Sequence, residues 1–332
     1  MEDRKKDHIE LAFASQTLVA DMDRRFMYEP MLSPHPLDAI PETDFLGKKI
    51  RLPMWVSSMT GGTRLAGTIN RNLARACREF GMGMGLGSCR IILEDDTYFE
   101  DFNMRDIIGD DLPLYANLGI NQLENILLEK KTVRLTELVH KLRADGLIIH
   151  VNPLQEWFQP EGDRLQRPAM ASMEELLDQV SFPVIAKEVG QGMGVESLRA
   201  LLRLPLAAIE FGAFGGTNFA RVELLRNKDQ SVELFEPLSY VGHDAAQMVD
   251  MINHIVEEEG DGLRCRQLIV SGGIRSFLDG YYLIRRSKLP AIYGQASAFL
   301  KHAREDYDQL RQFVAEQIKG LQMAYAFLRV RT

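Results

Sequence analysis

The sequence has few cysteines and no long apolar run. Only three cysteines are present among 332 residues, at Cys77, Cys89 and Cys265, and no two of them have the spacing of a zinc or redox pair. This scarcity excludes a disulfide scaffold and fits a reducing compartment. The longest purely apolar run, Leu204 to Ile209, is far too short to cross a bilayer. The charged start of the chain, MEDRKKDHIE, lacks the apolar core of a signal peptide, so we expect a cytoplasmic protein.

The chain also lacks basic clusters. Its formal net charge is −8, and the only run of three consecutive cations is Arg4-Lys5-Lys6. This balance argues against nucleic acid or an anionic membrane as the main partner. A local basic pocket inside an acidic protein can still bind a small anion. Hydrophobic residues make up 45% and charged residues 26% of the chain, as in ordinary globular proteins.

Short apolar runs recur along the chain, and most are followed by a turn and then a helical pattern. Eight runs are predicted as strands: 51–57, 83–86, 114–117, 146–150, 184–187, 208–210, 267–271 and 291–294. Helix-period apolar stripes occupy 65–80, 245–256 and 307–321, and the last has no strand after it. Eight strand–helix units predict a closed (β/α)₈ barrel, with a doubly wound open sheet as the alternative. We therefore expect one α/β barrel domain over residues 50–332, with a C-terminal helix, preceded by an extension over residues 1–49.

The stretch from His150 to Arg164 carries the densest group of polar side chains. It follows the apolar run Leu147-Ile148-Ile149 and presents His150, Asn152, Gln155 and Glu156 within seven residues. Pro153 and Pro160 predict a loop here in place of a helix or strand. In a barrel this loop lies at the C-terminal ends of the strands, where such folds place their chemistry. A solvated loop after an edge strand is the alternative.

Two glycine-containing turns after the last two predicted strands favour a phosphate site. They are Ser271-Gly272-Gly273-Ile274-Arg275 and Gly294-Gln295-Ala296-Ser297. Glycines let backbone amides approach a phosphate, and barrels commonly bind phosphate after strands seven and eight. Two ordinary strand-to-helix turns are the alternative.

Single polar residues after other predicted strands suggest a bound planar ring. Lys187 ends the fifth strand, where an ammonium would stabilise negative charge on a ring or oxyanion. A structural lysine paired with Glu188 or Asp163 is the alternative. Asn117, Ser58 and Thr60 have the groups needed to hydrogen-bond a heterocycle.

Glu156, next to Gln155, is the predicted ligand for a hard cation such as Mg²⁺, with Glu161 and Asp163 as competitors for that role. Cations for a diphosphate would come from Arg4, Lys5, His8, Arg90 and Arg221. A solvated, charged tail is the alternative for the N-terminal three.

Nine sequence motifs spread over nearly the whole chain resemble the type 2 isopentenyl diphosphate isomerases. The matching runs are RKKDHI from Arg4, SSMTGGT from Ser57, GLGSCR from Gly85, ANLGINQ from Ala116, HVNPLQE from His150, QPEGDR from Gln159, KEVGQGM from Lys187, GGTNFARVE from Gly215 and SGGIR from Ser271. HVNPLQE with QPEGDR is the most specific pair. The resemblance implies a flavin-binding (β/α)₈ barrel that converts isopentenyl diphosphate to dimethylallyl diphosphate with Mg²⁺ and with FMN reduced by NADPH or NADH.

The resemblance also implies the roles of individual residues. It implies an FMN site made of Ser58, Met59, Thr60, Ser88, Asn117, Lys187, Thr217, Gly272, Gly273, Arg275, Gln295 and Ala296. It implies that the diphosphate substrate is held by Arg4, Lys5, His8, Ser88, Arg90, Asn152 and Gln155, and the metal by Glu156. His150, Asn152 and Gln155 would be the catalytic side chains, in orienting or auxiliary proton-handling roles. Members of the family usually form tetramers or larger assemblies, so a homo-oligomer is expected.

The double-bond shift needs a proton added at one carbon and another removed elsewhere. No side chain in these sets is a strong enough acid to protonate an unactivated alkene, so the resemblance assigns that step to the reduced flavin. Cys89, Gly212 and Phe219 depart from the glutamine, serine and tryptophan that the family commonly has. Two other functions stay open: an FMN-dependent 2-hydroxy-acid oxidase on the same barrel, and a flavin- or phosphate-binding regulator without turnover.

Overall fold

The structure is a computed structural model, and it describes residues 2–36, 40–59, 61–160, 162–227 and 231–331. The predictions for Thr60 and Glu161 lie outside these residues. No helix in these ranges is long and apolar enough to cross a membrane.

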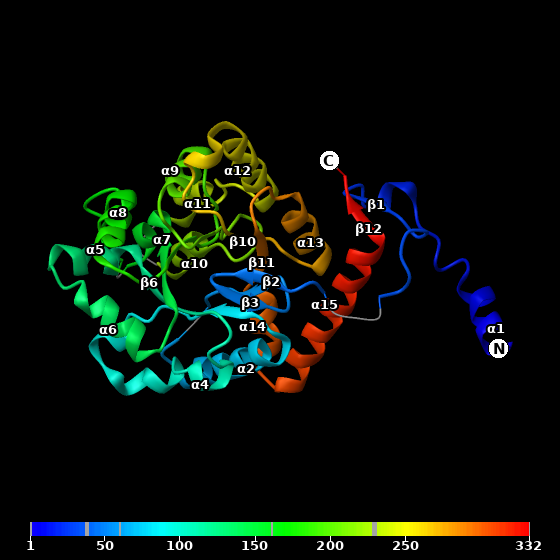
Figure 1. The fold of residues 1–332 in the computed structure, drawn as a ribbon, viewed down its shortest axis with the longest axis horizontal. Helices are drawn as coiled ribbons and strands as arrows, with labels where there is room; N and C mark the ends of the chain where they lie inside the picture. The colour runs from blue at the N-terminus through cyan, green and yellow to red at the C-terminus, as the bar shows by residue number, and fades with distance from the viewer. Residues whose placement is uncertain (1, 37–39, 60, 161, 228–230, 332) are drawn as a thin grey trace.

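Eight parallel strands close into a barrel in which each strand pairs with the next along the chain (Figure 1). Pairing of the last strand with the first, Tyr293 opposite Met54, completes the ring. The predicted (β/α)₈ barrel is therefore confirmed, and the open sheet is wrong. The barrel strands are β4 (Met54–Val56), β5 (Gly83–Gly85), β6 (Leu114–Gly119), β7 (Gly146–Val151), β8 (Val184–Glu188), β9 (Ala208–Glu210), β10 (Leu268–Ser271) and β11 (Ala291–Gln295).

Helices surround the barrel because their apolar stripes face the strands. In α2, for example, Thr63 caps the N-terminus by accepting a hydrogen bond from the Ala66 amide, and Gly81 ends the helix at φ 76°. The longer helices are α2 (Arg64–Phe80), α5 (Ile120–Leu128), α6 (Val133–Lys141), α8 (Ala169–Gln179), α9 (Val195–Arg203), α12 (Ala245–Glu259), α13 (Phe277–Arg286) and α15 (Tyr307–Phe327). Shorter pieces are α3 (Ile91–Glu94), α4 (Arg105–Ile108), α7 (Pro153–Phe158), α10 (Phe219–Arg226), α11 (Val232–Ser239), α14 (Ser297–Ala303), and the 3₁₀ turns η1 (Val19–Asp21), η2 (Asp96–Asp101) and η3 (Gly260–Gly262).

The predicted loop after β7 is wrong in two respects. The strand itself continues through His150 to Val151. Pro153 then occupies the first turn of α7, where a proline costs no hydrogen bond because that amide has no partner within the helix. The Asn152 side chain caps this helix by accepting a hydrogen bond of 2.9 Å from the Gln155 amide.

A strand does follow the closing helix, which the sequence analysis did not predict. β12 (Leu328–Val330) pairs antiparallel with β1 (Phe26–Tyr28), so the two ends of the chain meet in a ribbon beside α15 (Figure 1). The Tyr281 hydroxyl on α13 donates to the Leu328 carbonyl and fixes the ribbon on the barrel. Three residues give too short an alternation to mark a strand in the sequence.

A hairpin of β2 (Thr43–Phe45) and β3 (Lys48–Ile50) covers the end of the barrel at which the strands begin. Phe45 and Ile50 of this hairpin are fully buried. The Leu46 amide donates to the Gln267 side chain, which directly precedes β10. We call this N-terminal end of the barrel the floor.

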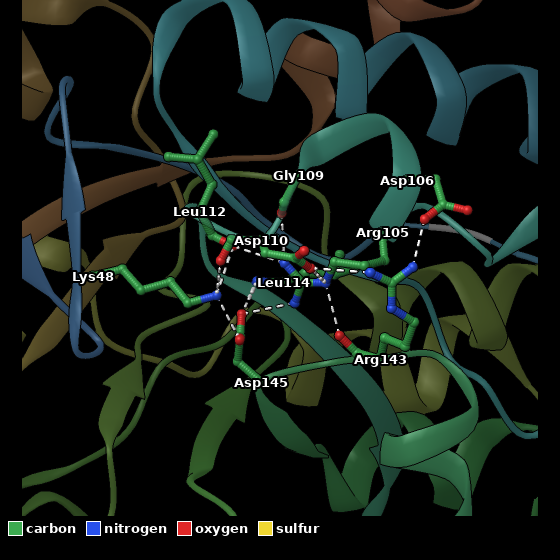
Figure 2. A network of polar contacts seen from close by, with 9 residues as sticks. All are labelled: Lys48, Arg105, Asp106, Gly109, Asp110, Leu112, Leu114, Arg143 and Asp145. Atoms are coloured by element: carbon green, nitrogen blue, oxygen red, sulfur yellow. Dashed lines mark hydrogen bonds and ion pairs between the residues drawn. The ribbon is translucent and has the colours of Figure 1, made fainter.

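A charged network holds the floor together where β6 and β7 begin (Figure 2). Asp145 accepts from the Lys48 ammonium at 2.5 Å, the Arg105 guanidinium at 2.9 Å and the Leu114 amide at 2.9 Å. Arg105 is only 2% exposed. Its guanidinium also donates to the carbonyls of Gly109, Leu112 and Arg143. The two cations at this end thus share Asp145 and are further held by backbone carbonyls of the protein itself.

Helix α1 (Glu2–Leu11) lies outside the barrel, beyond the ribbon of β1 and β12 (Figure 1). From residue 3 to residue 11 all of its side chains are exposed.

Candidate active site

A cavity of about 480 Å³ opens at the end of the barrel where the strands finish. We call this C-terminal end of the barrel the mouth. Residues from all eight strands or from the loops after them line the cavity, as expected for a (β/α)₈ barrel. Most of the predicted site residues meet here. Those lining the cavity are Ser58, Met59, Ser88, Asn117, His150, Gln155, Lys187, Thr217, Gly272, Gly273, Gln295 and Ala296.

The turn after β10 is shaped as a cradle of backbone amides. Gly272 and Gly273 have φ values of 90° and 70°, and a Cβ on Gly272 would lie 2.1 Å from the Ala213 carbonyl oxygen. Among the described residues, the amides of Gly272, Gly273 and Ile274 donate no hydrogen bond to the protein. Free amides beside the start of α13 form an anion-binding arrangement, so this turn fits the phosphate of a cofactor such as FMN.

Gln295 bridges this cradle to the closing helix. Its side-chain amide donates to the Ile274 carbonyl, and its oxygen accepts from Gln317 of α15 at 3.1 Å. Arg275 does not line the cavity. Its backbone amide donates to Asp279, and its side chain is exposed. Gln295 therefore positions the cradle, and the predicted contact of Arg275 with a cofactor stays a prediction.

The buried charge of the mouth is Lys187, which is 6% exposed at the end of β8. Its ammonium donates to the Glu188 carbonyl oxygen at 2.8 Å and lies 3.9 Å from the carboxylate of Glu210. The predicted structural partners were Glu188 and Asp163, but the Glu188 carboxylate instead accepts from the amides of Gly190, Gln191 and Gly192. Lys187 keeps donor capacity for a ligand because only one of its contacts is a short hydrogen bond.

Glu210, at the end of β9, was missed by the sequence analysis. Its side chain is 0% exposed, and one of its oxygens has no hydrogen-bond partner among the described residues. The other oxygen is within 3.4 Å of the Ser271 hydroxyl. A carboxylate that ends an otherwise apolar strand was the signal that could have identified it.

His150 and Asn117 form a second buried pair in the mouth. The His150 Nδ1 lies 2.7 Å from the side-chain oxygen of Asn117. Because that oxygen can only accept, Nδ1 carries the proton and Nε2 keeps its lone pair. Burial, with a smaller contribution from Lys187, lowers the pKa of His150 to about 4. The imidazole is therefore neutral near pH 7.

Several buried hydroxyl oxygens of the mouth have no protein partner. Ser57 and Ser58, directly after β4, both have buried hydroxyl oxygens without a hydrogen bond among the described residues. A buried hydroxyl without a partner costs about 1–3 kcal/mol, so such groups usually await a ligand or water. Their position at one wall of the cavity fits contacts to a bound ring.

Helix α7 carries both Gln155 and Glu156, but Glu156 does not line the cavity. Phe158 anchors the helix in a small apolar cluster with Ala220 and Leu224 of α10. Gln155 lines the cavity. Asn152 does not line it, and its side chain instead caps the helix. Burial, followed by the nearby charge of Asp163, raises the pKa of the Glu156 carboxyl.

No group of three or more His, Cys, Asp or Glu side chains in the described part of the chain is arranged to hold a metal ion. A Mg²⁺ ion that takes one protein carboxylate and completes its shell with phosphate oxygens and water needs no such group. Glu156 has the chemistry for that single carboxylate, while Glu161 lies outside the described residues.

The predicted diphosphate ligands are not gathered at the mouth. Ser88 lines the cavity and is exposed, but Arg90 does not line it. Arg4, Lys5 and His8 lie on α1, outside the barrel (Figure 1). Arg221 is on α10 and pairs with Glu236 at 3.0 Å. The cations predicted to bind the substrate are therefore not brought together at the mouth in this structure.

The three departures from the family pattern have different settings. Gly212 has φ 52°, and a Cβ there would lie 1.9 Å from the Glu188 carbonyl oxygen, so this backbone requires glycine. Cys89 is buried with its sulfur toward the Gly87 carbonyl, and burial raises the pKa of its thiol to about 12. Phe219 lines the cavity as an aromatic ring, as the tryptophan it replaces would.

Curated proteins similar to this chain carry one name. An isopentenyl-diphosphate delta-isomerase of Rickettsia felis is 35% identical over 324 residues, covering 96% of this chain and 90% of its own. The enzyme of the same name from Deinococcus radiodurans is 39% identical over 257 residues, covering 74% and 72% of the two chains. A third, from Mycolicibacterium gilvum, is 32% identical over 84% of this chain and 79% of its own. No protein-family model matches the chain.

Solved structures similar to this one are FMN enzymes with the same barrel. A mandelate oxidase mutant with an FMN monooxide adduct gives a TM-score of 0.55 at 18% identity, covering 92% of this chain and 88% of that one. A flavocytochrome b2 mutant with bound sulfite gives 0.62 at 15% identity, covering 91% and 72%. At such low identity these likenesses establish the fold alone.

Proposed function

Because the chain belongs to the family of the isopentenyl-diphosphate delta-isomerases, we propose that it interconverts isopentenyl diphosphate and dimethylallyl diphosphate by the flavin-dependent, type 2 reaction. The structural observation that supports the flavin-dependent type most strongly is the mouth itself. It combines a cradle of free amides after β10 with one buried ammonium, Lys187, across a cavity of about 480 Å³.

The residues of the mouth fit FMN at both of its ends. The amides of Gly272, Gly273 and Ile274 would hold the phosphate. Ser58, Met59, Asn117 and Lys187 would contact the ring from the opposite walls. When bound and reduced, FMN would supply the acid and base for the double-bond shift with no net transfer of electrons.

Lys187 stabilises negative charge in this proposal. An ammonium in a buried site acts on developing or resident negative charge more strongly than it would in water. Glu210 is 3.9 Å away and holds the ammonium at the end of β8. Glu210 is thus a positioning residue.

His150 acts as a neutral group that orients the substrate. Its Nδ1 proton is held by Asn117, so Nε2 can accept a hydrogen bond or take a proton transiently. A pKa of about 4 makes the imidazolium too scarce near pH 7 to serve as the main acid. Gln155 lines the same cavity and would fix the position of the diphosphate end.

Binding of the diphosphate requires groups that lie at or beyond the rim. We assign one Mg²⁺ to Glu156, with Ser88, Arg90 and Gln155 as further contacts of the diphosphate. Asn152 supports them by capping α7. In this proposal the substrate brings α1 to the mouth, where the helix adds Arg4, Lys5 and His8 to the binding site. Residues 1–49 would thereby form part of that site. Deleting residues 1–11 is then expected to raise KM for isopentenyl diphosphate and leave FMN affinity unchanged.

The remaining parts of the proposal follow from the same family assignment. NADPH or NADH would reduce the flavin, the enzyme would act as a homotetramer or larger homo-oligomer, and it would work in the cytoplasm. The formal net charge of −8 agrees with a small-molecule substrate and with neither nucleic acid nor membrane as a partner.

An anaerobic assay tests the function directly. Purified protein with FMN, a reductant and Mg²⁺ should convert isopentenyl diphosphate to dimethylallyl diphosphate, and the reductant should be consumed only once per flavin. Lys187→Met should lose this activity, and Lys319→Met, which removes an exposed lysine of α15, should keep it. Tight FMN binding without any isomerisation would refute the proposal and favour a regulator.

The same assay separates the isomerase from an oxidase of the 2-hydroxy-acid type. An oxidase would oxidise one equivalent of a hydroxy acid for each flavin reduced. The residues from Ser271 to Arg275 after β10 contain no histidine, which such oxidases place near this strand for catalysis. Reduction of the flavin by mandelate or lactate would contradict the proposed function.

A further inference from the structure

A second cavity, of about 390 Å³, lies between α12, α13 and the C-terminal strand β12. It shares no residue with the mouth. Its walls carry an unusual set of side chains, in which four of the eight residues are arginines: Asp250, Asn253, Tyr281, Arg285, Arg286, Arg329, Val330 and Arg331.

One of these arginines is neutralised by the protein. Arg286 forms two hydrogen bonds with Asp250, at 2.7 and 3.0 Å. Asp250 is the one carboxylate that the described residues contribute to the cavity wall, and this pair occupies it. Four guanidinium groups against one carboxylate therefore leave an excess of three positive charges.

The other three arginines have no carboxylate within ion-pair distance in the described part of the chain: Arg285, Arg329 and Arg331. The Arg285 side chain makes no hydrogen bond there, and the Arg329 side chain bonds only the carbonyls of Tyr325 and Leu328. The Arg331 side chain donates to the Phe26 carbonyl, while its backbone amide donates to the Arg25 carbonyl. All three are exposed. Elsewhere in the molecule several arginines face carboxylates, as in the pairs of Arg199 and Arg203 with Glu259.

Like charges gathered around one hollow repel one another and lower stability. Nothing in the fold requires them here, because the Tyr281 hydroxyl and the pairing of β12 with β1 already hold this strand in place. A planar guanidinium has five donors in a fixed fork, which suits the oxygens of phosphate. A polyanion with several phosphate oxygens would satisfy three guanidinium groups at once.

We propose that this arginine cavity is a second binding site, separate from the mouth, for a small phosphate-bearing polyanion such as a diphosphate group. Arg285 of α13 and Arg329 of β12 supply the free donors from opposite elements, and Arg331 adds charge at the rim. The Arg286–Asp250 pair sets one wall and prevents that guanidinium from turning away.

The site depends on the ribbon that joins the two ends of the chain. β12 carries Arg329 and leads directly into Arg331, and it is held by β1 and by Tyr281. A bound anion would cross-link β12 to α13. Binding at this site should therefore slow amide hydrogen exchange at residues 328–331 and at residues 26–28. It should not change the exchange of residues that line the mouth.

The test is titration of inorganic diphosphate into the FMN-loaded, full-length protein without added Mg²⁺, followed by calorimetry and hydrogen exchange. The double variant Arg285→Gln/Arg329→Gln should bind inorganic diphosphate at this site at least about tenfold more weakly, because it loses charge-assisted hydrogen bonds from two guanidinium groups. Arg264→Gln is the matched control, because it removes an exposed arginine that does not line the cavity. Isomerase activity should be unchanged in both, because neither touches the mouth.

A parallel titration with ADP identifies the source of the phosphates. Equal affinity for ADP and inorganic diphosphate means that the diphosphate group alone is recognised, and tighter binding of ADP means that a nucleotide carries it. Either result supports the site if the affinity falls in the double variant Arg285→Gln/Arg329→Gln. Unchanged affinity and stoichiometry in the double variant, with no protection at residues 328–331 in the wild type, would overturn the proposal.

Discussion

The floor and the mouth of the barrel both contain a buried cation beside a carboxylate, but they treat these charges differently. At the floor, Arg105 and Asp145 are linked at 2.9 Å, and three further hydrogen bonds join the Arg105 guanidinium to backbone carbonyls (Figure 2). At the mouth, Lys187 and Glu210 stay 3.9 Å apart, and one Glu210 oxygen has no partner among the described residues. Completed networks stabilise a fold, whereas incomplete ones keep binding capacity for a ligand. The difference marks one end of the barrel as structural and the other as functional.

The largest effect is expected from a substitution at the floor. Arg105→Met should lower the free energy of unfolding by about 3–5 kcal/mol, because it leaves the carbonyls of Gly109 and Arg143 and part of Asp145 without donors. Chemical denaturation measures the loss, and kcat/KM of the folded fraction should stay unchanged. Arg143→Met is the control, since its exposed ion pairs with Asp106 and Asp110 should contribute less than about 1 kcal/mol. Equal losses in the two variants would remove the distinction between buried and exposed pairs.

The corresponding change at the mouth should affect activity. Lys187→Met is expected to lower kcat/KM about 10²- to 10³-fold, as loss of a buried electrostatic contact typically does. Lys48→Met, at the floor, should leave kcat/KM unchanged while lowering stability, because its ammonium bonds Asp145 and two carbonyls.

Removing Lys187 also leaves Glu210 as an uncompensated buried carboxyl. Lys187→Met/Glu210→Gln should therefore regain stability relative to the single variant but not activity. Recovery of activity in the double variant would contradict the role given to Lys187.

A pH titration of stability sharpens the comparison further. His150 has a pKa of about 4 when folded, against 6.5 as the ordinary value. Between these values the unfolded chain binds a proton that the folded protein does not, so stability falls as pH drops from about 6.5 toward 4. The full contribution is about 3 kcal/mol. Urea denaturation at pH 7 and pH 4.5 should show a smaller difference in His150→Gln than in the wild type, and identical differences would contradict a buried neutral imidazole.

The smallest effect concerns the unpaired hydroxyls of the mouth. Ser57→Ala should raise the stability of the FMN-free protein by about 1 kcal/mol, because it removes a buried oxygen without a partner. The same change should weaken FMN binding, measured by fluorescence quenching. Thr63→Ala, which removes the hydroxyl that caps α2, should instead lower stability by about 1 kcal/mol. A loss of stability in Ser57→Ala would show that this hydroxyl is structural.

The barrel could be predicted because its strands are continuous apolar runs such as Leu147-Ile148-Ile149, and because buried parallel strands need that pattern. The ribbon could not, since β1 and β12 are three residues each and lie at opposite ends of the chain. Pro153 misled the prediction for α7, because a proline excludes a helix only beyond its first turn.

The site was predictable where it follows from strand order. Lys187, Asn117 and the turn after β10 reach one cavity because the ends of parallel strands in a barrel meet at one rim. Glu210 was not identified, because the short run Ala208–Glu210 gives no sign of which neighbour it faces. The placement of α1 was beyond the sequence for another reason: its charged, exposed residues make no contact that would fix it to the barrel.

The pairing of Phe26 with Val330 has a consequence for synthesis in the cell. β1 stays without its partner until the whole barrel between the two strands has been synthesised and β12 has left the ribosome. Until then Phe26 lacks its partner strand, and the arginines that follow Leu328 have no cavity to line. A product truncated before Leu328 would leave β1 unpaired and would lack the arginine cavity.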